Sequence, residues 1–179
     1  PPPVDCGFFA PLSSPQQHGA PFYLIVSALA PYKRVDIAVE AFNRLQLPLV
    51  VIGIGSERSK LERHASSSVT FLGWQPDAVV RDYYRRCEAL IFPGEEDFGI
   101  VPLEAQACGK PVIALGKGGA LETIIPLNSA APEVMACRSP TGVFFDEALV
   151  DPLCEAVSVY QRHAKAFDPV AIRQHALHF

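Results

Sequence analysis

The chain has 179 residues, of which 49% are hydrophobic, so one domain can bury a sizeable core without disulfides. Its formal net charge is −4, from 15 basic and 19 acidic side chains, and it has no long basic run, which argues against a nucleic-acid partner. Its longest apolar runs are far shorter than the roughly 20 residues that a membrane helix requires, so we expect no transmembrane segment.

The predicted elements begin after a proline-rich segment, 1–20, which starts Pro1-Pro2-Pro3 and is expected to be an extended interdomain linker and lead-in. Residues 21–179 are expected to form one domain. A short apolar run at 22–26 predicts a buried strand. In 35–45, apolar residues recur at helical spacing between charged ones, which predicts an amphipathic helix with one face on a sheet.

This alternation of strands and helices continues to Leu115. Further strands are predicted at 49–52, 69–72, 89–92 and 112–115, and helices at 57–65, 77–86 and 102–108. Ser56 is expected to cap the helix that follows it. Because the strands have no polar face and helices separate them, the pattern predicts an α/β fold with a doubly wound, Rossmann-like parallel sheet. Ligands bind such sheets beyond the carboxyl ends of the strands.

The pattern weakens after Glu122. An irregular surface loop is expected at 126–140, followed by the apolar run Val143-Phe144-Phe145 and by two helical stretches at 149–164 and 169–178. The last stretch is expected to be a truncated helix.

The five cysteines are odd in number and widely spaced, without a C-x-x-C pair. The five histidines share no spacing that would form a metal site or a catalytic triad. We therefore expect reduced thiols in a cytoplasmic protein, and no metal.

Two glutamates eight positions apart flank the start of the predicted helix at 102–108. Glu96 lies in the loop after a strand and Glu104 about one turn into the helix, so both can face one cleft. A carboxylate accepts two hydrogen bonds at once and suits the vicinal diol of a sugar or a ribose. Between them, the helix N-terminus favours anionic oxygens, and Gly99 would let a ligand approach closely. A solvated acidic loop at a helix N-terminus is the alternative interpretation.

This segment resembles the signature of the family-4 (group 1) retaining glycosyltransferases of the GT-B fold. The shared pattern is Glu-x7-Glu, with Phe-Gly inside it and Glu-Ala-x-Ala-x-Gly-x-Pro-Val after it. The resemblance implies that Glu96 contacts the transferred sugar and Glu104 the nucleotide ribose. It also implies that backbone amides of Phe98, Gly99 and Ile100 bind the sugar and the diphosphate.

The loop after the first strand, 27–36, resembles the diphosphate-binding loop of the same family. Lys33 matches the family's lysine, and a cation there can stabilise the negative charge of a leaving nucleoside diphosphate. Arg34 would add a planar fork for phosphate oxygens. Many members carry an arginine five positions before the lysine, where this sequence has Ala28, which leaves one cation fewer. The alternative is that both basic residues only decorate a helix start, although they oppose its dipole there.

Glycines follow two further strands. Gly53-Ile54-Gly55 starts like a dinucleotide fingerprint but lacks the third glycine. In the family the matching loop lines the nucleotide site, so Gly53 and Gly55 are donor-binding candidates, and a simple helix-capping turn is the alternative. Gly73 and Trp74 lie in a segment that resembles the loop whose backbone contacts the base. Partly buried packing of Trp74 is the alternative there.

The resemblance runs from about Pro2 to the C-terminus. It implies a C-terminal, nucleotide-sugar-binding domain whose N-terminal acceptor domain is absent and which is inactive alone. The full protein would transfer a hexose from a GDP- or UDP-linked donor, with GDP-mannose as the first expectation, to an acceptor hydroxyl in glycan or glycolipid synthesis. No cofactor is implied.

The acceptor, a glycan or a lipid, would bind through the missing domain. Enzymes of this kind that act on lipids often attach peripherally at the inner membrane face. A nucleotide-sugar epimerase of the same architecture and a non-catalytic nucleotide-binding module remain as alternative functions.

Overall fold

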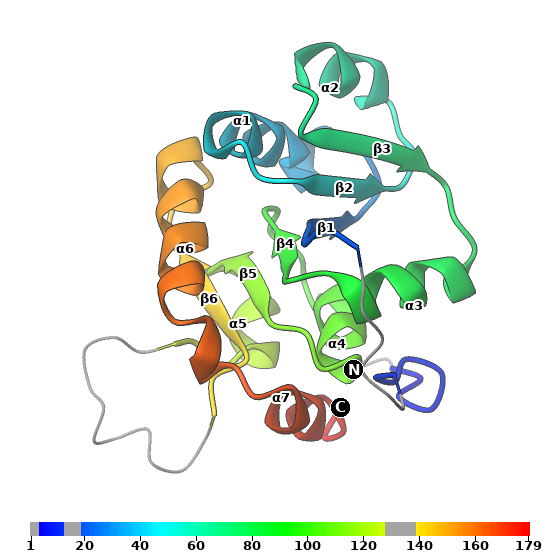
Figure 1. Cartoon of the computed structure of the whole chain (residues 1–179), viewed down its shortest axis with the longest axis vertical. Helices are drawn as coiled ribbons and strands as arrows, with labels where there is room; N and C mark the ends of the chain where they lie inside the picture. The colour runs from blue at the N-terminus through cyan, green and yellow to red at the C-terminus, as the bar shows by residue number, and fades with distance from the viewer. Residues whose placement is uncertain (1–3, 13–18, 128–138) are drawn as a thin grey trace.

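The computed structural model describes residues 4–12, 19–127 and 139–179. Six parallel strands form one sheet in the order β3-β2-β1-β4-β5-β6 (Figure 1). They are β1 (Tyr23–Val26), β2 (Leu49–Ile52), β3 (Val69–Gly73), β4 (Leu90–Phe92), β5 (Val112–Leu115) and β6 (Gly142–Phe145). The chain starts in the middle of the sheet, builds one half outwards and then returns to build the other. This order confirms the doubly wound, Rossmann-like fold.

Helices cover both faces of the sheet. Those described are α1 (Val35–Leu45), α2 (Arg58–His64), α3 (Asp77–Arg86), α4 (Ile100–Ala107), α5 (Ala120–Thr123), α6 (Val150–Arg162) and α7 (Pro169–Ala176), with 3-10 turns at Pro31–Lys33 and Ala164–Ala166. In Figure 1, α1 and α6 lie on one face, and α3, α4 and α7 on the other.

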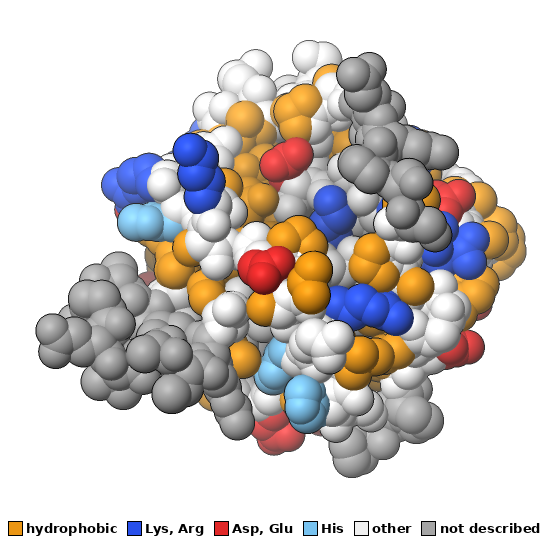
Figure 2. Space-filling view, turned by 60° about the horizontal axis from the view of Figure 1, so that its bottom comes forward, with side chains coloured by type: hydrophobic (Ala, Val, Ile, Leu, Met, Phe, Trp, Pro, Cys, Tyr) orange, Lys and Arg blue, Asp and Glu red, His pale blue; other side chains and the backbone are white. Residues whose placement is uncertain are grey.

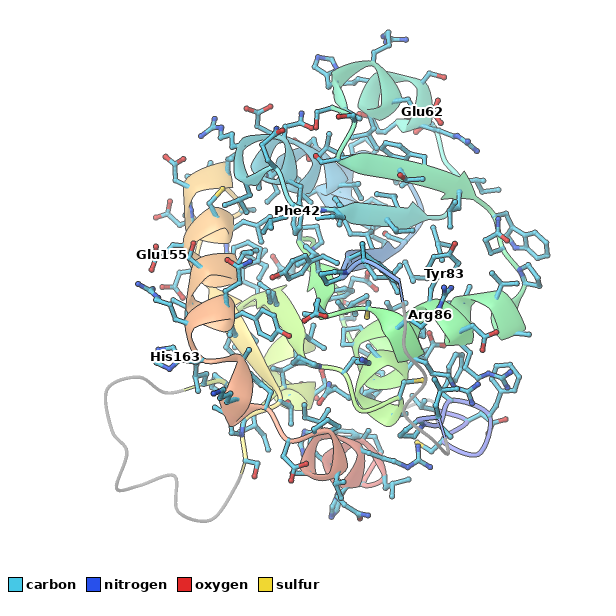
Figure 3. The ribbon with its side chains drawn as sticks, in the orientation of Figure 1. Phe42, Glu62, Tyr83, Arg86, Glu155 and His163 are labelled. Carbon is cyan, nitrogen blue, oxygen red and sulfur yellow. The ribbon has the colours of Figure 1, made fainter. Side chains whose placement is uncertain are left out.

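Two apolar clusters, one on each face, form the core. Successive strand residues point to opposite faces, so Ile25 joins the cluster under α1 and α6, whereas Leu24 joins the one under α3 and α4. Phe42 of α1, labelled in Figure 3, is fully buried and its ring lies 5.1 Å from that of Tyr23, centroid to centroid. The helical spacing that predicted α1 is therefore the spacing of its buried residues.

Three helix starts or loops differ from the sequence-based expectations. The N-cap of α2 is Glu57, not Ser56, and the Glu57 backbone N–H donates to the Leu29 carbonyl of a neighbouring loop at 3.0 Å. Helix α4 begins at Ile100 rather than at residue 102. The short helix α5 was not expected, because four residues are too few to show a period. Of the loop expected at 126–140, residues 128–138 lie outside the described residues.

The lead-in is a turn in its described part, whereas an extended linker was expected. The Asp5 carboxylate accepts the backbone N–H groups of Gly7 and Phe8 at 3.0 and 2.9 Å, which closes the turn. The ring of Phe9 then packs on that of Tyr84, with 5.9 Å between centroids. Residues 5–9 are therefore packed against the rest of the domain.

Arg173 of α7 attaches the lead-in to the rest of the fold. Its guanidinium donates to the carbonyls of Cys6 and Phe9, both at 3.0 Å, and to that of Ala107 at 2.5 Å. We expect Arg173→Ala to lower the free energy of unfolding by about 2 kcal/mol, because partly buried carbonyls lose a charged donor. Urea denaturation measures this loss. Arg162→Ala is the control, since among the described residues Arg162 pairs with the exposed Glu155, and an equal loss in both variants would contradict the assignment.

The surface carries both signs of charge. On the face shown in Figure 2, outside the grey atoms, Lys and Arg side chains are scattered among hydrophobic and acidic ones rather than gathered in one patch. No helix within the described residues is long and apolar enough to cross a membrane.

Candidate functional site

Two loops meet where the strand order reverses, between β1 and β4. The loop after β1 passes through the 3-10 turn Pro31–Lys33, and the loop after β4 contains Glu96. A Cβ on Gly94 would lie 2.9 Å from Cα of Lys33, so the two backbones are closer than a side chain at residue 94 would permit. Open α/β sheets bind their ligands at such a reversal.

Lys33 and Glu96 form an ion pair across this junction. Their side chains are only 15% and 24% exposed, so the pair is largely shielded from water. The Lys33 ammonium also lies over the ring of Tyr32, 5.0 Å from its centroid. The structure therefore brings the two predicted catalytic residues together, each neutralising the other.

The acidic loop, residues 93–99 between β4 and α4, packs against a pair of glycines that follow β5. The Gly119 N–H donates to the Glu96 carbonyl at 2.8 Å, and a Cβ on Gly119 would lie 2.4 Å from Cα of Phe98. A Cβ on Gly118, which has φ +55°, would lie 2.3 Å from the Glu96 carbonyl oxygen. Gly99 caps α4 with φ +76°, so glycine is favoured there by conformation as well as by the expected approach of a ligand.

A hollow of about 350 Å³ lies at the carboxyl ends of β1, β2 and β3. Among its lining residues are Ala28, Gly53, Ile54, Trp74, Asp77 and Glu104. The predicted donor-binding residues Gly53, Trp74 and Glu104 thus share one hollow. Gly73, with φ +72°, directly precedes Trp74. The partly buried packing considered for Trp74 is wrong, because Trp74 is 69% exposed.

Glu104 supplies a carboxylate to this hollow. The hydroxyl of Tyr84, a fully buried residue of α3, donates to Oε2 of Glu104 at 2.9 Å. Burial raises the pKa of Glu104 to about 7, with the nearby charge of Asp77 adding to the rise and the Tyr84 hydrogen bond opposing it. The Glu104 carboxyl therefore titrates near neutral pH.

The remaining predicted residues lie outside the lining of this hollow. Arg34 has a left-handed backbone, φ +51°, and its Nε pairs with Oδ1 of Asp36 at 3.2 Å. Gly55 allows two loops to meet, since a Cβ there would lie 2.3 Å from the Leu29 carbonyl oxygen. Phe98 and Ile100 flank the start of α4, where Ile100 is 39% exposed.

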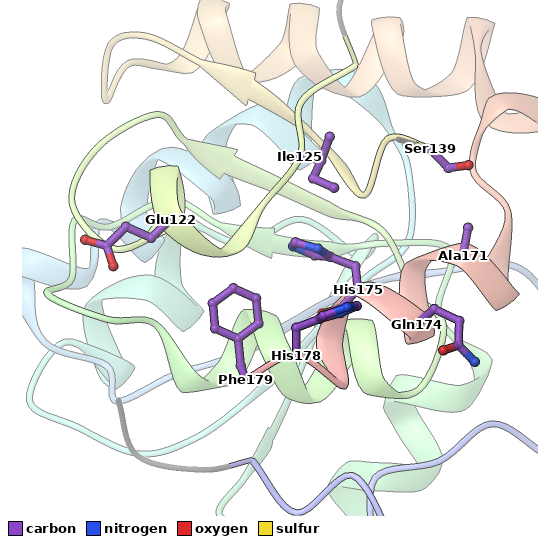
Figure 4. Close-up of a pocket in the computed structure, with 8 residues that line it drawn as sticks. All are labelled: Glu122, Ile125, Ser139, Ala171, Gln174, His175, His178 and Phe179. Atoms are coloured by element: carbon purple, nitrogen blue, oxygen red, sulfur yellow. The ribbon is translucent and has the colours of Figure 1, made fainter. Parts of the chain in front are cut away.

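A larger hollow, about 600 Å³, lies between α5 and α7 (Figure 4). Glu122, His175 and Phe179 are among its lining residues. None of its described lining residues is a predicted donor-binding residue, and the ring of Phe179 lies 6.5 Å from that of Phe98. The smaller hollow, at the carboxyl ends of three strands, is therefore the candidate donor site despite its size.

The model of a family described as glycosyl transferases group 1 matches residues 12–157. The chain belongs to this family. One relative, the GDP-mannose-dependent alpha-mannosyltransferase of Mycobacterium tuberculosis, is 31% identical over 149 residues, which cover 83% of this chain and 37% of that protein. The chain spans about a third of the length of the curated relatives it matches, between 28% and 33% for three others.

Solved structures of group 1 and related glycosyltransferases share the fold. The C-terminal domain of the group 1 protein LpcC from Francisella tularensis matches with a TM-score of 0.70 at 20% identity, covering 97% of this chain and 94% of that one. Anabaena HepE, solved in complex with UDP and glucose, matches with a TM-score of 0.67 at 21% identity, covering 87% of this chain and 42% of that one. These likenesses show that this chain has the same fold as a domain of these two proteins.

Sequence reasoning missed two features of this group 1 site. The contact of Tyr84 with Glu104 was not predicted from the sequence. The available signal was that Tyr84 lies four residues after Val80 in a helix, which places both on the face that packs on the core. The close approach of Gly94 to Lys33 had no local signal, because it depends on where two distant loops meet.

Proposed function

We propose that this chain is the C-terminal, donor-binding domain of a retaining glycosyltransferase. The full protein transfers a hexose from a nucleotide-sugar to an acceptor hydroxyl of a glycan or a lipid, which binds to an N-terminal domain. The observation that supports this proposal most is the Lys33–Glu96 ion pair at the reversal of the strand order, at the same edge of the sheet as the hollow that Glu104 lines.

The ion pair suggests how the donor is received. When the diphosphate enters, its oxygens attract the Lys33 ammonium away from Glu96, and the freed Glu96 carboxylate accepts hydrogen bonds from the sugar hydroxyls. As the bond between the sugar and the diphosphate breaks, negative charge builds up on the leaving group beside Lys33, which lowers the barrier. Each charge gains a new partner as the old one is lost, so neither is left unpaired in a shielded site.

The nucleoside end of the donor lies in the hollow. Glu104 accepts hydrogen bonds from the two ribose hydroxyls, with Tyr84 holding its other oxygen in place. Ala28, where many family members have an arginine, lines the hollow and leaves the diphosphate with Lys33 as its main cation. The mannosyltransferase among the relatives supports mannose from GDP-mannose as the donor.

Calorimetric titration of the chain with GDP, GMP, guanosine and UDP tests the proposal. We expect GDP to bind at least about tenfold more tightly than GMP, because the second phosphate reaches Lys33. No heat from any nucleoside diphosphate up to several millimolar would contradict a donor-binding function. We expect no transfer by the chain alone, because the acceptor groups lie on the other domain. Transfer by this chain at the rate of a full-length enzyme would refute that expectation.

A further inference from the structure

The hollow has a direction, because it crosses the ends of three adjacent strands. Ala28 follows β1, Gly53 follows β2, and Trp74 follows β3. Neighbouring strands are about 4.8 Å apart, so the hollow extends about 10 Å from β1 to β3. On the proposed function the diphosphate lies by Lys33 at the β1 end and the ribose by Glu104. The base must then lie at the β3 end, beside Trp74.

The β3 end of the hollow carries an aromatic face and a free acceptor. Trp74 is 69% exposed and offers its indole ring for stacking. Asp77, the first residue of α3, also lines the hollow, and its carboxylate has no hydrogen bond or ion pair with any other described residue. Among the described lining residues there is no Lys, Arg or His to neutralise it. At this end of the hollow, the Asp77 carboxylate therefore accepts hydrogen bonds from a base and repels the electron-rich atoms of a base, such as carbonyl oxygens.

Only one common base fits a carboxylate in this way. Guanine presents two adjacent donors, N1–H and the N2 amino group, which match the two oxygens of a carboxylate. Uracil presents one N–H between two carbonyl oxygens, which a carboxylate repels. Adenine presents an amino group beside an unprotonated ring nitrogen, so it offers one donor and one mismatched acceptor.

We propose that Asp77 selects a guanine nucleotide, by accepting hydrogen bonds from N1–H and N2 of a base stacked on Trp74. This inference rests on the proposed function and adds to it the residue that determines which nucleotide is used. A position at the first turn of α3 also favours an acidic residue through the helix dipole, but that role requires no particular ligand. The experiment must therefore separate base selection from helix stability.

Calorimetry with GDP, inosine diphosphate and UDP makes this separation, since inosine differs from guanosine only by the missing N2 amino group. We expect the wild-type chain to bind GDP at least about tenfold more tightly than UDP, with inosine diphosphate between them. Asp77→Asn should weaken GDP about tenfold, remove the difference between GDP and inosine diphosphate, and leave UDP unchanged or tighter, because the new amide donor suits a carbonyl. Asp82→Asn is the matched control on the same helix; its carboxylate pairs with Arg85 and lies outside the hollow.

The outcomes distinguish the two proposals. Equal weakening of GDP and UDP by Asp77→Asn, or a wild-type preference for UDP, would overturn guanine selection by Asp77. In that second case, binding that still depends on Glu104 would leave the donor-binding function in place. If none of the nucleoside diphosphates binds, both proposals fail. Should Asp77→Asn melt at a markedly lower temperature, equal binding of GDP and inosine diphosphate by the wild-type chain would still overturn the proposal.

Discussion

Lys33→Ala is expected to lower the affinity of the chain for GDP about 100-fold, because the diphosphate loses its main cation in a site largely shielded from water. The Lys33 side chain is 15% exposed, so bulk solvent and salt screen its charge poorly. Lys33→Arg keeps the positive charge but changes its shape, and we expect an intermediate loss. Calorimetry at fixed ionic strength measures all of these affinities.

Glu96→Gln should act in the opposite direction on the same ligand. The amide no longer holds the Lys33 ammonium, so GDP, which carries no sugar, is expected to bind several-fold more tightly. Transfer by the full-length enzyme should fall, because the sugar loses a charged acceptor. If both variants weakened GDP equally, the exchange of partners proposed for Lys33 would be ruled out.

Glu104→Ala is expected to lower GDP affinity about 30-fold or more, and acidification should produce much of the same loss in the wild-type chain. Ribose hydroxyls donate to the ionised carboxylate, whose pKa in the folded protein is raised to about 7. Affinity should therefore be highest above pH 8 and fall about tenfold per unit below pH 7, down to the level of the alanine variant. Titrations from pH 5 to 8 measure this slope. A flat profile for the wild type, or the same slope in Glu104→Ala, would disprove the assignment.

Stability without ligand should change with pH in the opposite sense. The raised pKa of Glu104 means that the folded chain binds more protons than the unfolded chain between pH 4.5 and about 7. The contribution of Glu104 to stability is thus present at low pH and is lost as pH rises through about 7. Glu104→Gln, which cannot ionise, should remove this part of the pH dependence in urea denaturation. The carboxylate that favours ligand binding is therefore costly to the empty protein.

The sequence predicted most of the sheet, because its strands are continuous apolar runs between amphipathic helices. Ile25 and Phe42 lie where the period of their segments requires. Lys33 and Glu96 were each placed in a loop after a strand from the sequence. Their pairing is a finding of the structure, which makes β1 and β4 neighbours.

Other contacts could not be predicted, because they depend on packing between distant segments. The Tyr84 hydroxyl meets Glu104 across two helices, and nothing in either helix alone marks the partner. The prolines at the start of the sequence predicted an extended segment. The structure instead has a turn that Asp5 closes and that Arg173 of α7 contacts. Arg34 was expected at the phosphates from its charge, yet its left-handed backbone and Asp36 determine where the guanidinium lies.

The clamp made by Arg173 ties together parts of the chain that are more than 160 residues apart. Its guanidinium joins the carbonyls of Cys6 and Phe9 to the last described helix, so residues 6–9 are held against α7. On the proposed function, a domain that precedes this one in the full protein would meet it beside α7, on the side of the sheet covered by α3 and α4.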